Sequence, residues 1–260
     1  MRTGSGADIT VDGDVVIKVH RLGTDAAALA IRLRIAAGLG QPATGCLLAP
    51  LEDEPRAVGD RWSTRWPRVE TVPVRPEELP WVEAAQLLAQ LHRTPVHVAI
   101  PHGAAARVRR AVHQLPASAA PVVSESAATL PEQIREAGAP GRPHTLVHGD
   151  FHLGQLGRPP GGGWRLIDID DLGVGDPAWD LARPAGFWAA GLIDNDDWQA
   201  FLTAYREAGG PAIPASGDPW PILEPLARAA VVQAAAAGAH RPLDETQVEL
   251  VAACARMLPG

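Results

Sequence analysis

The chain has 260 residues, which is enough for one large domain or two small lobes with hydrophobic cores. Hydrophobic residues make up 46% and charged residues 20% of the sequence, a globular balance that excludes a disordered chain. A net charge of -7 without a dense Lys/Arg block argues against nucleic-acid binding and is mildly better suited to a cationic small molecule.

The cysteines and the distribution of apolar residues indicate the cellular compartment of the protein. Cys46 and Cys254 are far apart in the sequence and form no pair with metal-binding spacing, which predicts buried free thiols in a reducing cytoplasm. No apolar run approaches the length of a membrane span, and residues 1–10 contain no signal-peptide core. We therefore expect a cytoplasmic protein that does not bind membranes.

The first predicted element is a β-hairpin over residues 8–22. Apolar residues alternate on both sides of Asp12-Gly13, a pair of residues typical of a tight turn. Because strand side chains alternate between faces, Lys18 is expected on the face opposite its apolar neighbours. The next element is a helix over 24–38, with Thr24 as its cap.

The remaining elements separate a β-rich front part from a helical back part. Strand-like stretches are expected at 46–51, 62–72 and 164–169. Helices are expected at 81–93, 104–114, 130–137, 178–192, 196–208, 219–238 and 244–258, the last starting with Asp244-x-x-Gln247 like a capping box. The pattern predicts two domains, residues 1–75 and residues 76–260.

The segment most informative about chemistry is 146–182. His148-Gly149-Asp150 is followed five residues after the aspartate by Gln155, and Asp168 ends an apolar strand eighteen residues after Asp150. Phosphoryl transfer needs one carboxylate that accepts the proton of the attacking hydroxyl, and an amide oxygen and a second carboxylate that hold Mg²⁺. A short loop and a β-turn-β connection are expected to bring these three oxygen-bearing side chains together.

Two linked strings in this segment resemble the aminoglycoside-phosphotransferase/choline-kinase branch of the protein-kinase-like superfamily. The branch carries HGDxHxxN, and the chain has HGDFHLGQ at 148–155. The branch also carries a hydrophobic-I-D-x-D string that leads to G-D-P-x-x-D-L-A, and the chain has LIDID at 166–170 and GDPAWDLA at 175–182. The resemblance implies an α+β, bilobal protein-kinase-like fold with a small, truncated β-rich N-lobe and a larger helical C-lobe.

The resemblance also implies roles for individual residues. Asp150 would be the catalytic base, Gln155 and Asp168 would be ligands of Mg²⁺, and Lys18 would contact the phosphates of ATP or GTP. The segment 65–69 would meet the purine. The residues expected to bind the nucleotide are Lys18, Trp66, Val69 and Ile167. The supporting set is His148, His152, Asp170 and Asp180, with Asp180 bracing the catalytic loop through its backbone.

The chain departs from the family pattern in three ways. Gln155 replaces the usual Asn, as in some maltokinase-like sugar kinases of the superfamily, which favours a carbohydrate acceptor. The glycine-rich loop is missing or reduced to Thr3-Gly4-Ser5-Gly6. The helix over 24–38 has no Glu to pair with Lys18, so either Asp25 replaces that Glu or Lys18 is held by Asp168 and phosphate.

Three functions are compatible with these residues. The leading one is a kinase that phosphorylates a hydroxyl of an antibiotic, sugar or small metabolite, with acceptor residues around 179–193 and in the last helices. The second is a pseudokinase that binds a nucleotide or metabolite without turnover. The third, a metal-dependent hydrolase built on His148, Asp150 and His152, fits the GDPAWDLA string less well.

Several of these residues also have a purely structural interpretation. Taken singly, the two histidines are typical of hydrogen-bonded structural residues, and Asp168 and Asp170 of solvated loop acids. Asp176 is expected mainly to cap the helix that follows Pro177. The acidic residues that could meet a cationic acceptor, Asp194, Asp196 and Asp197, are equally typical of a solvated helix start.

Overall fold

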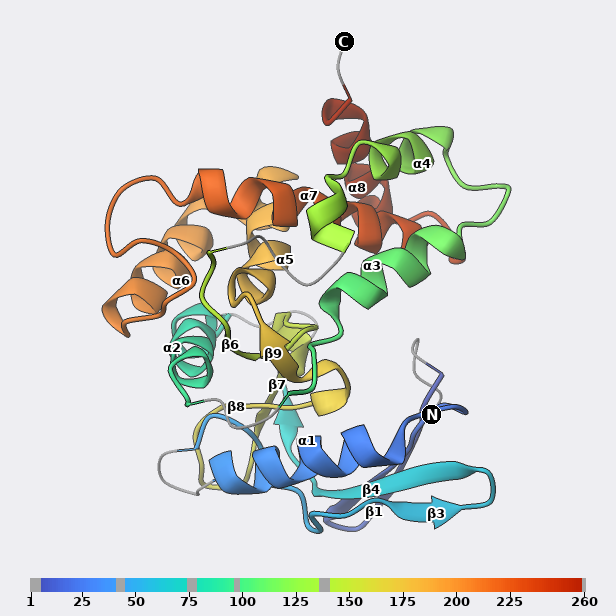
Figure 1. Cartoon of the computed structure of the whole chain (residues 1–260), viewed down its shortest axis with the longest axis vertical. Coiled ribbons are helices and arrows are strands. Elements are labelled where there is room, and N and C mark those ends of the chain that lie inside the picture. Colours follow the sequence, from blue (N-terminus) through green and yellow to red (C-terminus); the bar gives the residue numbers. More distant parts are fainter. Residues whose placement is uncertain (1–5, 41–44, 74–78, 96–98, 136–140, 259–260) are drawn as a thin grey trace. The chain divides into compact units, whose positions relative to one another are not determined.

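The computed structural model describes residues 6–40, 45–73, 79–95, 99–135 and 141–258 (Figure 1). The chain divides into two compact units. The first unit contains Met1–Pro80 and Leu153–Asp170, and the second contains Trp81–His152 and Asp171–Gly260. Residues 153–170 therefore group with the first 80 residues of the chain.

The first unit is built on a four-stranded antiparallel sheet with the strand order β1-β2-β4-β3. Its strands are β1 (Asp8–Asp12), β2 (Val15–Val19), β3 (Arg56–Val58) and β4 (Arg61–Pro67). The hairpin of β1 and β2 turns at Gly13, whose φ of +57° suits a residue without a Cβ. The predicted hairpin is therefore confirmed.

Strand register places Lys18 on the more buried face of this sheet. Lys18 pairs with Thr64, and both residues are buried, whereas Ile17 on the opposite face is half-buried. Trp66 lies two residues beyond Thr64 in β4, so its side chain shares the face of Lys18. The prediction that Lys18 faces away from its apolar neighbours is confirmed.

Helix α1 (Ala26–Leu39) begins two residues after the start of the predicted range 24–38, and Thr24 is not its cap. Asp25 is the cap, because its Oδ1 accepts hydrogen bonds from the backbone N–H groups of Ala27 and Ala28 at 2.9 and 3.2 Å. The Thr24 hydroxyl donates to the carbonyl of Arg21 instead. In Figure 1, α1 crosses in front of the strands of the sheet.

A smaller sheet of the first unit carries the segment rich in predicted site residues. It consists of β5 (Glu70–Thr71), β7 (Leu156–Arg158) and β8 (Arg165–Leu166), in the order β5-β7-β8. The expected strand over 46–51 is wrong, because this segment contributes only an isolated bridge from Leu47 to Leu166. The expected strand over 164–169 is shorter than predicted and ends before a 3-10 turn at Ile169–Asp171.

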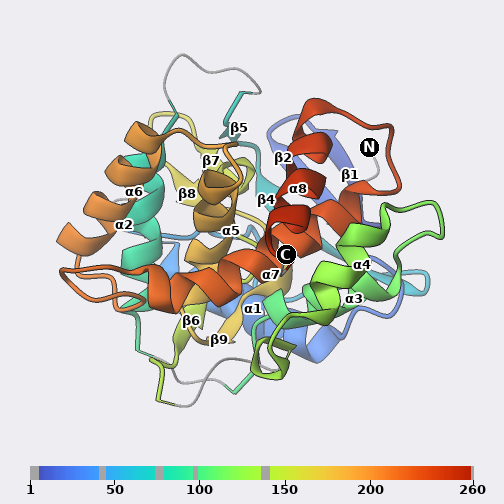
Figure 2. The ribbon, with the colours of Figure 1, turned by 90° about the horizontal axis from the view of Figure 1, so that it is seen from above.

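The second unit contains seven helices among its described residues and a two-stranded sheet (Figure 2). The helices are α2 (Trp81–His92), α3 (Ala104–His113), α4 (Pro121–Ala128), α5 (Ala178–Ala189), α6 (Asn195–Glu207), α7 (Trp220–Gly238) and α8 (Glu245–Arg256). The sheet pairs β6 (Thr145–Val147) with β9 (Gly173–Gly175).

Six of these helices match predicted segments, and one does not. Helix α4 was not predicted; it starts at Pro121, which suits a first helical position. The helix expected over 130–137 is a 3-10 turn at Glu132–Arg135, and residues 136 and 137 lie outside the described residues. Asp244 caps α8 as predicted, since its Oδ1 accepts the N–H of Gln247 at 2.8 Å.

The core of the second unit forms where α5 crosses α7. A Cβ at Gly186 would lie 2.7 Å from the carbonyl oxygen of Ala227, so glycine permits this close approach. Cys46 in the first unit and Cys254 in the second are buried, as predicted, and burial raises the pKa of each thiol to about 11.

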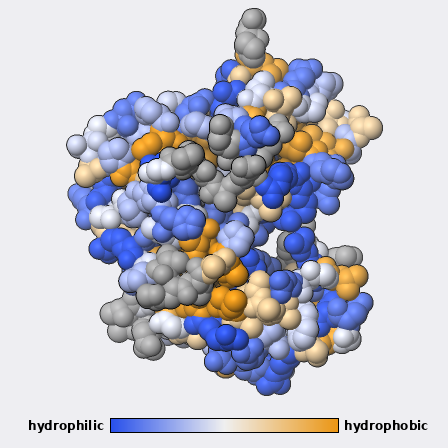
Figure 3. All heavy atoms as spheres, in the orientation of Figure 1, coloured by the Kyte–Doolittle hydropathy of each residue, from blue (hydrophilic) through white to orange (hydrophobic). Residues whose placement is uncertain are grey.

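Hydrophilic residues cover most of the face drawn in Figure 3, and hydrophobic residues appear there in small groups. Across the described residues, no helix combines the length and apolar character that crossing a membrane requires.

Candidate active site

In the first unit, Lys18 pairs with two of the predicted acids. Its Nζ lies 2.7 Å from Asp168 Oδ1 and 2.9 Å from Asp170 Oδ2, and its side chain is 10% exposed. His20 Nδ1 lies 3.3 Å from Asp170 Oδ1. Lys18 is also the only lysine in the sequence, since the other 22 of the 23 Lys and Arg residues are arginine.

The pairing keeps Lys18 and Asp170 charged, although Lys18 is buried and Asp170 is half-buried. Burial acts to lower the pKa of Lys18, but Asp168 and Asp170 outweigh it and the pKa is raised. Burial likewise acts to raise the pKa of Asp170, but Lys18 and His20 lower it below its usual range. A cation held among acids in this way is suited to contact phosphate oxygens.

Asp168 has an unusual backbone conformation. Its φ of +63° is the only positive value for a non-glycine residue in the described ranges. This left-handed conformation is rare for residues with a Cβ, although Asp tolerates it, and such strain gathers at functional sites. The contact with Lys18 uses Oδ1, so Oδ2 is left for another ligand, and 35% of the side chain is exposed.

A backbone hydrogen bond in the smaller sheet joins Gln155 to Ile167, the residue that precedes Asp168. Gln155 ends the 3-10 turn Leu153–Gln155, and its carbonyl accepts the N–H of Ile167 at 2.9 Å. The residue as a whole is buried, at 8% exposure. An amide oxygen and a carboxylate oxygen are donors that Mg²⁺ prefers, so these two residues fit the cation by their chemistry.

Two predicted nucleotide-binding residues meet at Gly157 in β7. A Cβ at Gly157 would lie 2.6 Å from Val69 Cγ2 and 2.8 Å from Ile167 Cγ2. Glycine therefore lets these two apolar side chains approach the strand backbone. Trp66 lies on the sheet face of Lys18, where its indole N–H donates to Thr64 Oγ1 at 2.9 Å. The candidate phosphate-cover residues Thr3, Gly4 and Ser5 lie outside the described residues.

In the second unit, Asp180 holds the loop that carries the predicted catalytic base. Its carboxylate accepts hydrogen bonds from the backbone N–H groups of His148, at 2.6 Å, and Gly149, at 2.8 Å. His92 Nε2 lies 3.0 Å from the same carboxylate. Burial acts to raise the pKa of Asp180, but His92, His148 and the Gly149 N–H lower it below its usual value, so the carboxylate stays ionised.

The loop also requires a glycine between His148 and Asp150. Gly149 has a φ of +83°, and a Cβ there would collide with the carbonyl oxygen of Asp171. The loop therefore turns sharply and presses against the segment that begins at Asp171. Asp150 follows this turn, which fixes the direction in which its side chain leaves the loop.

Asp150 itself contacts two arginines. Arg107 Nη2 lies 2.9 Å from its Oδ2, and Arg183 Nη1 lies 3.6 Å from its Oδ1. Burial raises the pKa of Asp150, and the two arginines only partly oppose this effect. His152 is half-buried near the same arginines, and its pKa is lowered to about 3, mainly by loss of contact with water, so its imidazole is neutral at pH 7. A raised carboxylate pKa suits a residue that accepts a proton.

Several residues that the structure places around Asp150 and Asp180 were not predicted from the sequence. Arg107 and His92 carried no signal in the sequence, because each is distant from the motifs and has the pattern of an ordinary surface or core residue. Asp171 was overlooked although it directly follows the LIDID string at 166–170. Arg183 could have been found, since it follows Asp180 by three residues in a helix and so shares its face. Asp176, expected to cap a helix, accepts the Ala178 N–H at 2.9 Å.

The predicted acceptor acids at the start of α6 serve the helix. Asp194 is its cap and accepts the N–H of Asp197 at 2.8 Å, while Asp196 and Asp197 lie in the first turn. Asp194 and Asp196 are exposed and match the solvated helix start that the sequence left open, whereas Asp197 is half-buried.

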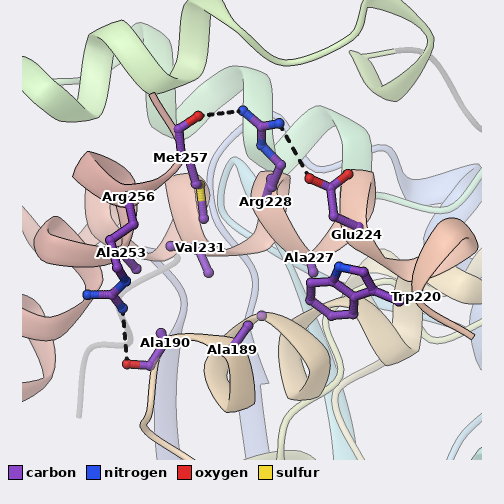
Figure 4. Close-up of a pocket in the computed structure, with 11 residues that line it drawn as sticks. Ala189, Ala190, Trp220, Glu224, Ala227, Arg228, Val231, Ala253, Arg256 and Met257 are labelled. Atoms are coloured by element: carbon purple, nitrogen blue, oxygen red, sulfur yellow. Dashed lines mark hydrogen bonds and ion pairs between the residues drawn. The ribbon is translucent and has the colours of Figure 1, made fainter. Parts of the chain in front are cut away.

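A separate cavity of about 290 Å³ lies among α5, α7 and α8 (Figure 4). Alanines line much of it, and its arginines contact the protein itself. Arg228 reaches Glu224 and the carbonyl of Met257, and Arg256 reaches the carbonyl of Ala190. We assign this cavity a packing role, because the guanidinium groups at its edge bridge helix ends.

The first unit contains a buried lysine paired with acids, and the second unit contains a carboxylate with a raised pKa. The sequence model of the phosphotransferase enzyme family, APH, matches residues 8–220. The chain belongs to this family. Among curated proteins, no significant match was found.

Several solved structures share the fold. A choline/ethanolamine kinase family protein from Mesorhizobium loti has a TM-score of 0.59 and 18% identity, with 96% of this chain and 83% of that chain covered. Choline kinase LicA from Streptococcus pneumoniae has a TM-score of 0.62 and 13% identity, with 96% and 89% covered. The AMP-bound spectinomycin phosphotransferase APH(9)-Ia has a TM-score of 0.59 and 14% identity, with 100% and 89% covered. The predicted α+β kinase-like fold is confirmed.

Proposed function

We propose that this protein is a cytoplasmic small-molecule kinase that transfers the γ-phosphoryl group of ATP or GTP to a hydroxyl group of an antibiotic, sugar or small metabolite. The observation that carries the proposal is the contact of Lys18, the only lysine of the chain, with Asp168 at 2.7 Å. The family match and the AMP and ADP complexes of the spectinomycin phosphotransferase support a nucleotide as the donor.

In this proposal, residues 1–75 form the nucleotide-binding lobe and residues 76–260 form the catalytic and substrate lobe. Lys18 binds phosphate oxygens, and Trp66, Val69 and Ile167 contact the base. Gln155 and Asp168 hold Mg²⁺, which when bound neutralises charge on the phosphates.

The catalytic group in this proposal is Asp150. It orients the acceptor hydroxyl and takes its proton as the oxygen attacks the phosphorus atom. Asp180 keeps the loop that carries Asp150 in place through the N–H groups of His148 and Gly149. The neutral His152 follows Asp150 by two residues. The main catalytic contributions are then alignment and charge stabilisation, without a covalent intermediate.

The second candidate is a pseudokinase that binds a nucleotide or metabolite without turnover. The missing helix Glu favoured this alternative at the level of the sequence. Asp170 reduces the weight of that argument, because its Oδ2 lies 2.9 Å from Lys18 and provides a second acidic partner. A metal-dependent hydrolase centred on Asp150 is disfavoured by the two arginines beside that residue, which repel a divalent cation.

Calorimetric titration tests the proposal. ATP and GTP are titrated with and without Mg²⁺ into the wild-type protein and into the Asp168→Ala variant. Binding that depends on Mg²⁺ and is lost in the variant supports the kinase. Binding without Mg²⁺ dependence supports the pseudokinase instead. Absence of binding of either nucleotide to the folded wild-type protein contradicts both assignments.

A further inference from the structure

The carboxylate of Asp150 lies between two arginines from different helices of the second unit. Arg107 comes from α3 and contacts Oδ2, and Arg183 comes from α5 and lies nearer Oδ1. Arg107 also pairs with Asp171 through Nη1 at 2.9 Å. Each oxygen of the predicted base therefore has a guanidinium group beside it, and one of the two guanidinium groups is shared with a second acid.

Arg183 has hydrogen-bonding capacity that these contacts do not use. Its distance of 3.6 Å to Asp150 exceeds that of a hydrogen bond. Its other contact within the described chain is with the ring of Phe187, where Cζ lies 5.4 Å from the centroid. A quarter of its side chain, 25%, is exposed. The planar group thus stacks on an aromatic ring and retains N–H donors for an oxyanion.

The charges around Asp150 disfavour a cationic acceptor. Asp150 and Asp171 are the acids of this cluster, and arginines already neutralise both. His152 adds no charge, because its pKa is lowered to about 3 by burial and by the arginines. An ammonium group placed beside Asp150 would meet two guanidinium groups and no unpaired carboxylate of the cluster.

We propose that the acceptor carries a carboxylate or phosphate group near the hydroxyl that becomes phosphorylated, and that Arg183, with Arg107 beside it, binds this oxyanion. The inference rests on the proposed kinase function and narrows its acceptor to hydroxy acids, sugar acids and sugar phosphates. Binding of the oxyanion draws the guanidinium of Arg183 away from Asp150, whose Oδ1 then faces the acceptor hydroxyl.

The first experiment uses inorganic phosphate as the probe, titrated by calorimetry in the presence of saturating MgADP. We expect millimolar binding to the wild type, at least tenfold weaker binding to Arg183→Gln, and unchanged binding to Arg241→Gln, which removes an exposed arginine elsewhere. Arg183→Lys keeps the charge but not the planar fork, so its affinity should fall between these values. Equal phosphate affinity in the wild type and in folded Arg183→Gln, or no binding to the wild type, would overturn the proposal.

The second experiment compares acceptors that share one ring: glucuronate, glucose 6-phosphate, glucose and glucosamine, each with MgATP. ADP release above the rate without sugar is measured, together with the affinity of each compound. We expect the acids to bind at least tenfold more tightly than glucose and glucosamine, and the difference to disappear in Arg183→Gln. The glucuronate and glucose 6-phosphate arms distinguish a carboxylate from a phosphate. Tighter binding of glucosamine than of both acids contradicts the proposal.

The two proposals fail in different ways. If MgATP does not bind while phosphate binding still depends on Arg183, the kinase function is wrong and the anion site is real. If MgATP binds but phosphate affinity does not respond to Arg183→Gln, the kinase function stands and the acceptor is not an anion.

Discussion

Lys18 Nζ lies 2.9 Å from Asp170 Oδ2, a contact that answers the question raised by the missing helix glutamate. The sequence offered Asp25 as one replacement for that residue. Asp25 instead caps α1 with its carboxylate, and the partners of Lys18 are Asp168 and Asp170, both of which follow β8. One short acidic segment, which includes the proposed cation ligand Asp168, thus positions the lysine.

The pairing of Lys18 with Asp170 predicts different effects for two substitutions of acidic residues, one on nucleotide affinity and one on stability. Asp170→Asn removes a charged partner of Lys18 and should weaken MgATP binding about tenfold, which is ~1.4 kcal/mol. Asp25→Ala removes the helix cap and should lower the free energy of unfolding by about 1 kcal/mol, with MgATP affinity unchanged. Calorimetry and urea unfolding measure the two quantities. A loss of nucleotide affinity in Asp25→Ala alone would contradict the pairing.

The sharp turn at Gly149 makes a second prediction. Gly149→Ala should slow turnover at least tenfold and destabilise the fold, because its Cβ collides with the carbonyl oxygen of Asp171. Gly161→Ala is the matched control: Gly161 also has a positive φ, +69°, but nothing lies within 4 Å of an added Cβ. Both variants are compared by ADP release and by thermal unfolding. Equal effects would show that the collision is unimportant.

Asp180 should stabilise the second unit in a manner that depends on pH. Asp180→Asn leaves His92 and two loop N–H groups without their charged partner, and breaking such a buried pair costs about 3 kcal/mol or more. Because the pKa of Asp180 is lowered in the folded protein, its contribution is complete above the unfolded pKa of about 4 and is lost as pH falls through the folded value. Urea unfolding of wild type and variant should therefore differ most near neutral pH and converge in acid. The exposed Asp196→Asn serves as the control.

Asp150 should govern the acid limb of the pH–rate profile. Its pKa is raised, so turnover should fall as pH drops through that raised value, because a protonated carboxyl cannot accept the hydroxyl proton. Asp150→Asn should lower turnover about 10²–10⁴-fold with MgATP affinity unchanged. Arg107→Gln removes a group that lowers the Asp150 pKa, so its acid limb should move to higher pH. A profile that Arg107→Gln leaves unchanged would exclude Asp150 as the titrating base.

The sequence predicted most of the helices and the elements that carry the motifs, because apolar periodicity and turn residues are local signals. The hairpin around Gly13 and the start of α8 at Asp244 are examples. It failed at 46–51 and 164–169, where short apolar runs form bridges and turns because neighbouring segments decide the pairing. Helix α4 was missed because its alanines and serines give no clear apolar face.

The residues of the candidate site likewise divide into those that local sequence patterns reveal and those that only tertiary packing brings together. Residues within the two motifs, such as Asp150, Asp168 and Asp180, were predicted from the motif spacing together with the family resemblance that the motifs carry. Arg107 and His92 reach the site only through the packing of α3 and α2, which no local pattern encodes. The uniqueness of Lys18 was visible in the sequence and was the strongest overlooked signal, since arginine occupies every other basic position.

Because Lys18 is the only lysine, one labelling measurement tests the central claim directly. The protein is treated with an acyl-phosphate derivative of ATP, which acylates an amine close to bound phosphates, and the modified peptides are identified by mass spectrometry. The account predicts labelling of Lys18 that MgATP suppresses and that Asp168→Ala reduces, while the N-terminal amine reports non-specific reaction. Labelling of Lys18 no greater than that of the N-terminal amine, or unaffected by MgATP, would contradict the account.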